Sequence, residues 1–168
     1  MTIRILIAGS LLIAGAAEAA TIPASLAVPD NGALILGAKA KGVQIYLCGP
    51  DKDDPSHMVW SLKAPEASLF DAAGTEIGKH FGGPSWSLND GSLVTGQVAA
   101  KESSPVAGAI PWLLVKVASN NDKGAFSHAT YIQRIDTQGG AQPTDACTAG
   151  QESRVAYSAT YQFYGTKP

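Results

Sequence analysis

The chain has 168 residues, a formal net charge of −2 at pH 7 and a hydrophobic content of 45%. Its 12 basic side chains nearly balance its 14 acidic ones, and its lysines stand singly apart from the close pair Lys39 and Lys41. Proteins that bind nucleic acids or anionic membranes carry a concentrated basic surface, so we expect neither partner here.

The first segment, residues 1–20, has the pattern of a cleavable secretory signal. Arg4 precedes an apolar run over residues 5–13, and Ala17 and Ala19 provide an A-x-A-like cleavage site. The apolar run is too short to cross a bilayer. We therefore expect an exported protein, periplasmic or extracellular, whose mature part is one β domain over residues 21–168 without a transmembrane segment.

The mature part predicts β structure, because 18 glycines and 10 prolines in the chain separate short runs of alternating or β-branched residues. Seven of these runs are predicted as strands: residues 33–36, 43–48, 58–62, 92–98, 112–117, 129–135 and 155–163. Alternation is clearest in the last run, where Tyr157, Tyr161 and Phe163 share one face. In the second run, Val43, Ile45 and Leu47 share a face.

Two further local features are predicted between these strands. A hairpin is expected over residues 68–78, since Asp71 can start a type I turn and Gly74 can take the positive φ that closes it. A short helix is expected within residues 99–107, where Pro105 limits its length. The fold class is therefore all-β, a single-domain antiparallel sandwich or barrel with long loops and at most a short helix.

The two cysteines, Cys48 and Cys147, both lie in the exported part. Because thiols oxidise outside the cytosol, we expect a disulfide between them. The alternative is two buried free thiols. A thiol-redox role is not favoured, because the chain has no Cys-x-x-Cys motif.

Several blocks occur in an order that resembles a known family. They are Gly42–Cys48, Ala64–Ala67, Leu69–Asp71 with Gly74, His80–Trp86, Asp90–Ser92, Ile110–Leu114, Tyr131–Ile135 with Thr137, Gly139-Gly140 and a closing aromatic strand. From about Val28 to Tyr164 the chain resembles the DUF3455 family of exported proteins of unknown function. The resemblance implies export and carries over no catalytic or binding residue. The chain departs from the family pattern at Ala156, where the family usually has a proline.

The block from His80 to Trp86 is the most site-like stretch, because a histidine and an aromatic residue flank a Gly-Gly-Pro turn. His80 could act as a general base or metal ligand if Glu66, Asp71 or Asp90 lay beside it. The alternative is that its ring nitrogens bond to the backbone.

No metal or cofactor site is expected from the remaining motifs. The spacing of His57 and His128 from His80 matches no compact ligand motif, and the mature chain has no nucleotide-binding or hydrolase signature.

Aromatic residues and one arginine are further binding candidates. The three tryptophans and Tyr46, Tyr131, Tyr157, Tyr161 and Tyr164 could stack on sugars or form an apolar cup, although most are expected in the core, with Trp86 the nearest to an exception. Arg134 lies among alternating apolar residues and would need a partner if buried. We expect Asp90, Asp136 or Glu66 in that role, with binding of a substrate carboxylate as the alternative.

Three functions remain open from the sequence. The first is a non-catalytic module that binds a small molecule, glycan or envelope component at a site including His80, Trp86, Asp90, Arg134 and Glu66. The second is an exported hydrolytic or metal-assisted enzyme that uses His80 with a carboxylate. The third is a structural protein that self-associates through a sheet edge. The oligomeric state is not predicted.

Overall fold

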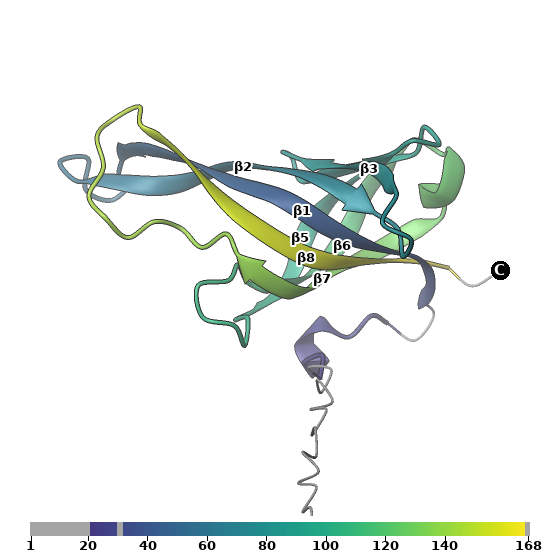
Figure 1. Ribbon diagram of the computed structural model, residues 1–168. Coiled ribbons are helices and arrows are strands. Elements are labelled where there is room, and N and C mark those ends of the chain that lie inside the picture. The colour runs from purple at the N-terminus through teal and green to yellow at the C-terminus, as the bar shows by residue number, and fades with distance from the viewer. Residues whose placement is uncertain (1–20, 30–31, 167–168) are drawn as a thin grey trace, which may run out of the picture.

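The computed structural model describes residues 21–29 and 32–166, so the predicted signal over residues 1–20 lies outside the described residues. Eight antiparallel strands follow one another in chain order around a closed barrel (Figure 1). They are β1 (Gly32–Pro50), β2 (Met58–Phe70), β3 (Glu76–Phe81), β4 (Ser85–Leu88), β5 (Leu93–Glu102), β6 (Trp112–Asn120), β7 (Ala129–Gly139) and β8 (Glu152–Thr166).

Pairing of the first strand with the last closes the ring. The β1–β8 register runs from Gly32 opposite Thr166 to Leu47 opposite Glu152. This closure confirms the all-β prediction and selects the barrel over the sandwich. Because the strands alternate in direction, the β1–β2, β3–β4, β5–β6 and β7–β8 connections share one end of the barrel, and the other three connections share the opposite end.

The predicted strands are found with different lengths. The runs 33–36 and 43–48 belong to the single strand β1, and β2 extends into the first arm of the predicted hairpin. The hairpin turn is confirmed: the Asp71 carboxylate accepts hydrogen bonds from the amides of Ala73 and Thr75, and Gly74 has a φ of 82°.

The short strand β4 was not predicted, and the helix expected within residues 99–107 is wrong. β5 continues to Glu102 because its pairing with β6 extends that far, and the residues after it form turns. The helical segments that the structure describes are two 3-10 turns, η1 (Ala24–Leu26) and η2 (Gly124–Phe126).

Small residues of β1 face large rings of β8 inside the barrel. Ala38 lies opposite Tyr161 and Gly42 lies opposite Tyr157 in the β1–β8 register. The rings of Tyr157, Tyr161 and Phe163 are all buried, as the alternation in this segment predicts. The small side chains on one strand thus leave interior space that the rings of the next strand fill.

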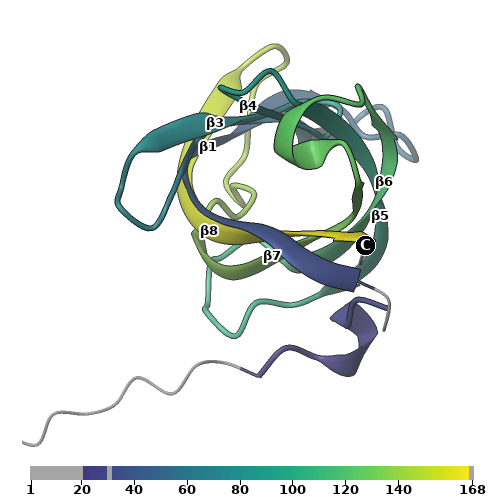
Figure 2. The ribbon, with the colours of Figure 1, turned by 90° about the vertical axis from the view of Figure 1, so that its right-hand side faces the viewer.

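One end of the barrel is plugged by Phe126 of η2, which is fully buried with its ring centroid 4.5 Å from that of Phe163. The carboxylate of Asp90 holds the plug in place, because it accepts hydrogen bonds from the Ala125 amide at 2.8 Å and from Ser92. Figure 2 views the ring from this end and shows the η2 turn at its opening.

The segment before β1 packs on the outside of the barrel. Leu26 of η1 is fully buried against Trp112, Leu114 and Ile135. The side-chain amide of Gln133 donates a hydrogen bond to the Leu26 carbonyl at 2.6 Å, which fixes the segment to β7.

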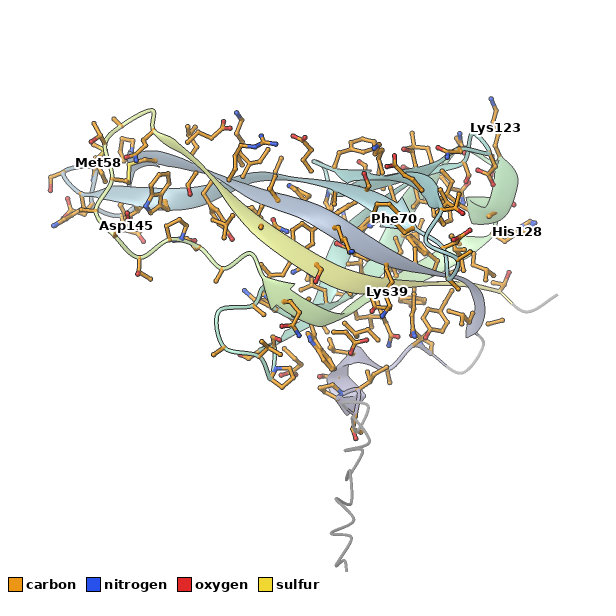
Figure 3. The ribbon with its side chains drawn as sticks, in the orientation of Figure 1. Lys39, Met58, Phe70, Lys123, His128 and Asp145 are labelled. Carbon is orange, nitrogen blue, oxygen red and sulfur yellow. A yellow bond between two sulfur atoms is a disulfide. The ribbon has the colours of Figure 1, made fainter. Side chains whose placement is uncertain are left out.

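At the end opposite the plug, β1, β2 and β8 run past the ring as an extension. Figure 3 shows Met58 and Asp145 at the tip of this extension and Lys123 and His128 at the plugged end. The predicted disulfide is present: Cys48 in β1 is bonded to Cys147 in the loop that connects β7 with β8. The bond therefore ties this loop to the extension.

We predict that replacing both Cys48 and Cys147 with alanine lowers the free energy of unfolding. The two residues are 99 positions apart, and a cross-link over such a loop stabilises by about 4.7 kcal/mol if it acts mainly by restricting the unfolded chain. Denaturant unfolding of the double variant and the oxidised protein measures the difference. An unchanged free energy would contradict the prediction, and the oxidised protein treated with a reductant serves as the control that should match the variant.

Candidate functional site

The end of the barrel opposite Phe126 opens into a hollow of about 680 Å³. Its walls come from the connections that share this end, including the Gly82-Gly83-Pro84 turn between β3 and β4, residues 109–111 before β6 and residues 141–142 after β7. Gln44, His80 and Arg134 line it from the strands. The volume lies within the range of small-molecule sites, and we refer to this space as the mouth hollow.

Arg134 is the charged group of this interior. It lies opposite Tyr161 in the β7–β8 register, so its side chain shares the inner face with that buried ring. Its Nε donates a hydrogen bond of 3.0 Å to the Pro111 carbonyl. Residues 109–111 are themselves fixed to β7, because the Thr137 hydroxyl donates to the Ile110 carbonyl at 2.6 Å.

The carboxylates expected beside Arg134 are elsewhere. Glu66 accepts a hydrogen bond of 2.8 Å from Arg154 on the outer surface, Asp136 accepts one from Thr160, and Asp90 holds the plug at the far end. Within residues 21–29 and 32–166, Arg134 forms no ion pair. The prediction of a structural ion pair for Arg134 is therefore wrong, because the register places all three carboxylates off the inner face or at the opposite end.

The positive charge of Arg134 acts on four interior groups. Burial raises the pKa of Tyr46, Tyr157 and Tyr161, and the guanidinium opposes that rise in each case. It also contributes to a lowered pKa of His80. These four rings therefore lie within electrostatic range of one guanidinium.

Four buried polar atoms of the barrel interior have no hydrogen-bond partner among the described residues. They are the Gln44 side-chain nitrogen, the Trp86 indole nitrogen and the hydroxyls of Tyr157 and Tyr161. A buried polar atom without a partner costs about 1 to 3 kcal/mol of folding free energy. Of these four residues, Gln44 lines the mouth hollow, whereas the Tyr157, Tyr161 and Trp86 groups approach one another in the buried interior.

His80 is buried at the base of the hollow, with 3% of its surface exposed. Its ring stacks on Trp86 with centroids 4.5 Å apart, and Nδ1 is 2.9 Å from the Ser85 carbonyl. Since a carbonyl only accepts, Nδ1 carries the proton and Nε2 carries the lone pair. Burial lowers the pKa of His80 to about 4, so the ring is neutral at pH 7.

The carboxylates proposed as partners of His80 are not brought to it. Glu66 faces outward, and Asp71 and Asp90 lie in the β2–β3 and β4–β5 connections at the plugged end. The described residues contain no group of three or more histidine, cysteine, aspartate or glutamate side chains placed to hold a metal ion.

Among the predicted site residues, the structure thus brings together His80, Trp86 and Arg134 and leaves Glu66 and Asp90 apart. Trp86 is 2% exposed, so it packs in the core and offers no open stacking face. The sequence reasoning missed Gln44, which is also 2% exposed. The signal for it was a polar residue on the face of β1 opposite to Val43 and Ile45.

The rim of the hollow is apolar and basic. Exposed Leu62 on β2 and Val98 on β5 line it, and so do Lys63 and Lys101. Lys63 pairs with Glu152 at 2.8 Å. No aspartate or glutamate is among the described residues that line the hollow.

A comparison with protein-family models gives one match: the family described as protein of unknown function (DUF3455) matches residues 29–165. The chain belongs to the DUF3455 family. No match was found among curated proteins or among solved structures. The match spans all the strands that form the mouth hollow of this DUF3455 protein, from β1 to nearly the end of β8.

No helix in the part of this DUF3455 protein that the structure describes is long and apolar enough to cross a membrane.

We predict that His80 makes folding of this DUF3455 protein sensitive to mild acid. Its pKa is about 4 in the folded state and 6.5 in the unfolded chain, so only the unfolded state binds the proton between these values. The free energy of unfolding then falls by about 3 kcal/mol from pH 7 to pH 4 through this group. Urea unfolding across this range, for the protein and for His80→Asn, measures the contribution.

Asparagine keeps a donor near the Ser85 carbonyl and does not titrate, so the variant should lose less stability on acidification than the protein itself. Equal losses in the two proteins would contradict the assignment of a neutral, buried His80.

Proposed function

We propose that this DUF3455 protein is exported and acts as a non-catalytic module that binds a small molecule in the mouth hollow of its barrel. The observation that carries the proposal is the asymmetry of the two ends. Phe126 plugs one end, whereas the other opens into about 680 Å³ of space lined by Arg134 and by Gln44, whose buried side-chain nitrogen has no partner among the described residues. A small molecule that supplied hydrogen bonds there would offset the cost of burying those atoms.

Export is supported by the signal-like pattern of residues 1–20 and by the disulfide between Cys48 and Cys147. Disulfides persist in oxidising compartments such as the periplasm and the extracellular space. The disulfide also has a local role in the proposal. It holds the β7–β8 loop, whose residues 141–142 form part of the wall of the hollow.

A small molecule is favoured over a glycan because the three tryptophans are not displayed on the surface. Trp60, Trp86 and Trp112 are between 2% and 6% exposed. Sugars that stack on a protein need an open aromatic face, and none of the three tryptophans provides one.

Binding is favoured over catalysis because His80 has no carboxylate to orient it. A general base is normally held by a third group, and the His80 ring is held instead by the Ser85 carbonyl and by stacking on Trp86. Association through a sheet edge is not favoured either, because β1 and β8, which would be the edge strands of an open sheet, pair with each other.

We predict that narrowing the mouth weakens binding. Leu62 on β2 and Val98 on β5 line the hollow and are 56% and 54% exposed, so tryptophan at both positions reduces its entrance without disturbing the core. We expect N-phenyl-1-naphthylamine, an uncharged fluorescent probe, to bind the protein in a saturable manner. The Leu62→Trp/Val98→Trp variant should bind it about tenfold more weakly, a change of about 1.4 kcal/mol.

The matched control is Leu34→Trp/Leu93→Trp, which alters two exposed residues away from the hollow and should leave the affinity unchanged. Native mass spectrometry of the protein purified from an exporting host adds a second measurement, the mass of any retained molecule. The assignment of the probe site to the mouth hollow fails if both double variants bind the probe as the protein does.

A further inference from the structure

Resting on the proposed function, we infer that the ligand is an organic monoanion, a carboxylate on an apolar body, whose charged group is bound by Arg134 inside the barrel. The inference names a ligand class and a specificity-determining residue. It depends on four features of the mouth hollow: a guanidinium without a carboxylate partner, the charge count around it, the unpartnered side-chain nitrogen of Gln44 and the apolar walls.

The positive charge of Arg134 is not paired with a carboxylate of the described residues. Nε donates to the Pro111 carbonyl at 3.0 Å and the Tyr161 hydroxyl lies close to the guanidinium, but no carboxylate of the described residues pairs with the two terminal amino groups. This hydrogen bond fixes the plane of the guanidinium. A fork of two parallel N–H donors matches the two oxygens of a carboxylate.

The charge count favours one negative charge on the ligand. At the base of the hollow Arg134 is the single cation, because the neighbouring His80 ring is neutral at pH 7. Lys63 is engaged by Glu152, and Lys101 is at the exposed rim. A phosphate group carries close to two negative charges at this pH and would be left undercompensated at such a depth.

The donors around Arg134 suit an anion as well. The side-chain nitrogen of Gln44, a residue that is 98% buried, has no partner and belongs to a residue that lines the hollow. The Tyr161 hydroxyl does not line the hollow; it lies close to Arg134, Tyr157 and Trp86 in the buried interior. A carboxylate has about four lone-pair positions, so it can accept from the guanidinium and from a second donor together.

The rest of the hollow suits an apolar body. Leu62, Val98, Pro111 and Leu113 line it between the base and the rim. No acidic side chain among the described lining residues would repel an anion on its way in. A ligand that enters the hollow therefore passes apolar side chains before it reaches the guanidinium of Arg134.

The test compares two molecules of nearly equal shape, 2-naphthoate and 2-naphthamide, by isothermal titration calorimetry at pH 7 and low salt. We expect the carboxylate to bind at least about tenfold more tightly than the amide, because a charge-assisted bond replaces a neutral one. In the Arg134→Gln variant we expect the preference to disappear, because the affinity for the carboxylate falls to about that for the amide.

The control is Arg154→Gln, which removes an arginine from the outer surface, where it pairs with Glu66, and should keep the preference. A second pair of variants does not touch the interior. Leu62→Glu adds a negative charge at the rim and should weaken the carboxylate several-fold more than the amide, whereas Leu34→Glu should affect neither.

The outcomes separate this inference from the proposed function. Equal affinities of the carboxylate and the amide for the unmodified protein would overturn the inference and leave small-molecule binding intact. A preference that survives Arg134→Gln would also overturn the assignment to Arg134. If naphthoate, naphthamide and the uncharged naphthylamine probe all fail to bind, the proposed function itself fails.

Discussion

The pairing of β1 with β8 determines what the rest of this barrel can be. Once the ring is closed, every second side chain of eight strands points into one shared interior, and that interior must be filled, plugged or left open. In this protein the two halves differ. Phe126, Phe163 and Leu69 fill one half with apolar side chains, whereas the other half contains Gln44, His80 and Arg134.

The polar half is costly to fold, and that cost is the main reason to regard it as functional. The buried side-chain nitrogen of Gln44, which has no partner among the described residues, reduces stability by about 1 to 3 kcal/mol, and a partly buried guanidinium without a carboxylate adds to that cost. The remaining structure supports this region with many fixed contacts. The Thr137 hydroxyl fixes residues 109–111, the Tyr46 hydroxyl donates to the Gly140 carbonyl at 2.6 Å, and the disulfide fixes the β7–β8 loop. A rigid shell around unpartnered donors is what pre-organised binding requires.

The sequence was informative where local rules decide the structure. The face shared by Tyr157, Tyr161 and Phe163 follows from alternation along one strand, and the turn at Asp71 follows from the chemistry of its side chain. The barrel itself could not be separated from a sandwich, because the choice depends on pairing between β1 and β8, which lie more than 100 residues apart. The sequence did not predict β4, because its four residues next to a Gly-Gly-Pro turn are too few to show a clear alternation.

The candidate site was predictable only in part, for a physical reason. Along residues 43–48 the apolar face is Val43, Ile45 and Leu47, yet the interior contains Gln44 and Tyr46, because this stretch of β1 borders the mouth hollow. Local alternation fails there because the interior at this level is polar. The carboxylates expected as partners of Arg134 were also consistent with the sequence taken alone. The order of connections around the ring puts Asp90 at the opposite end, and no spacing along the chain reveals that.

The most direct test of this account is a high-resolution crystal structure of the protein purified from an exporting host without refolding. The account predicts an open hollow at the end opposite Phe126, with an ordered molecule or waters hydrogen-bonded to Arg134 and to the side-chain nitrogen of Gln44. A structure in which Arg134 pairs with an aspartate or glutamate of this chain, and in which its own side chains fill the hollow, would contradict it.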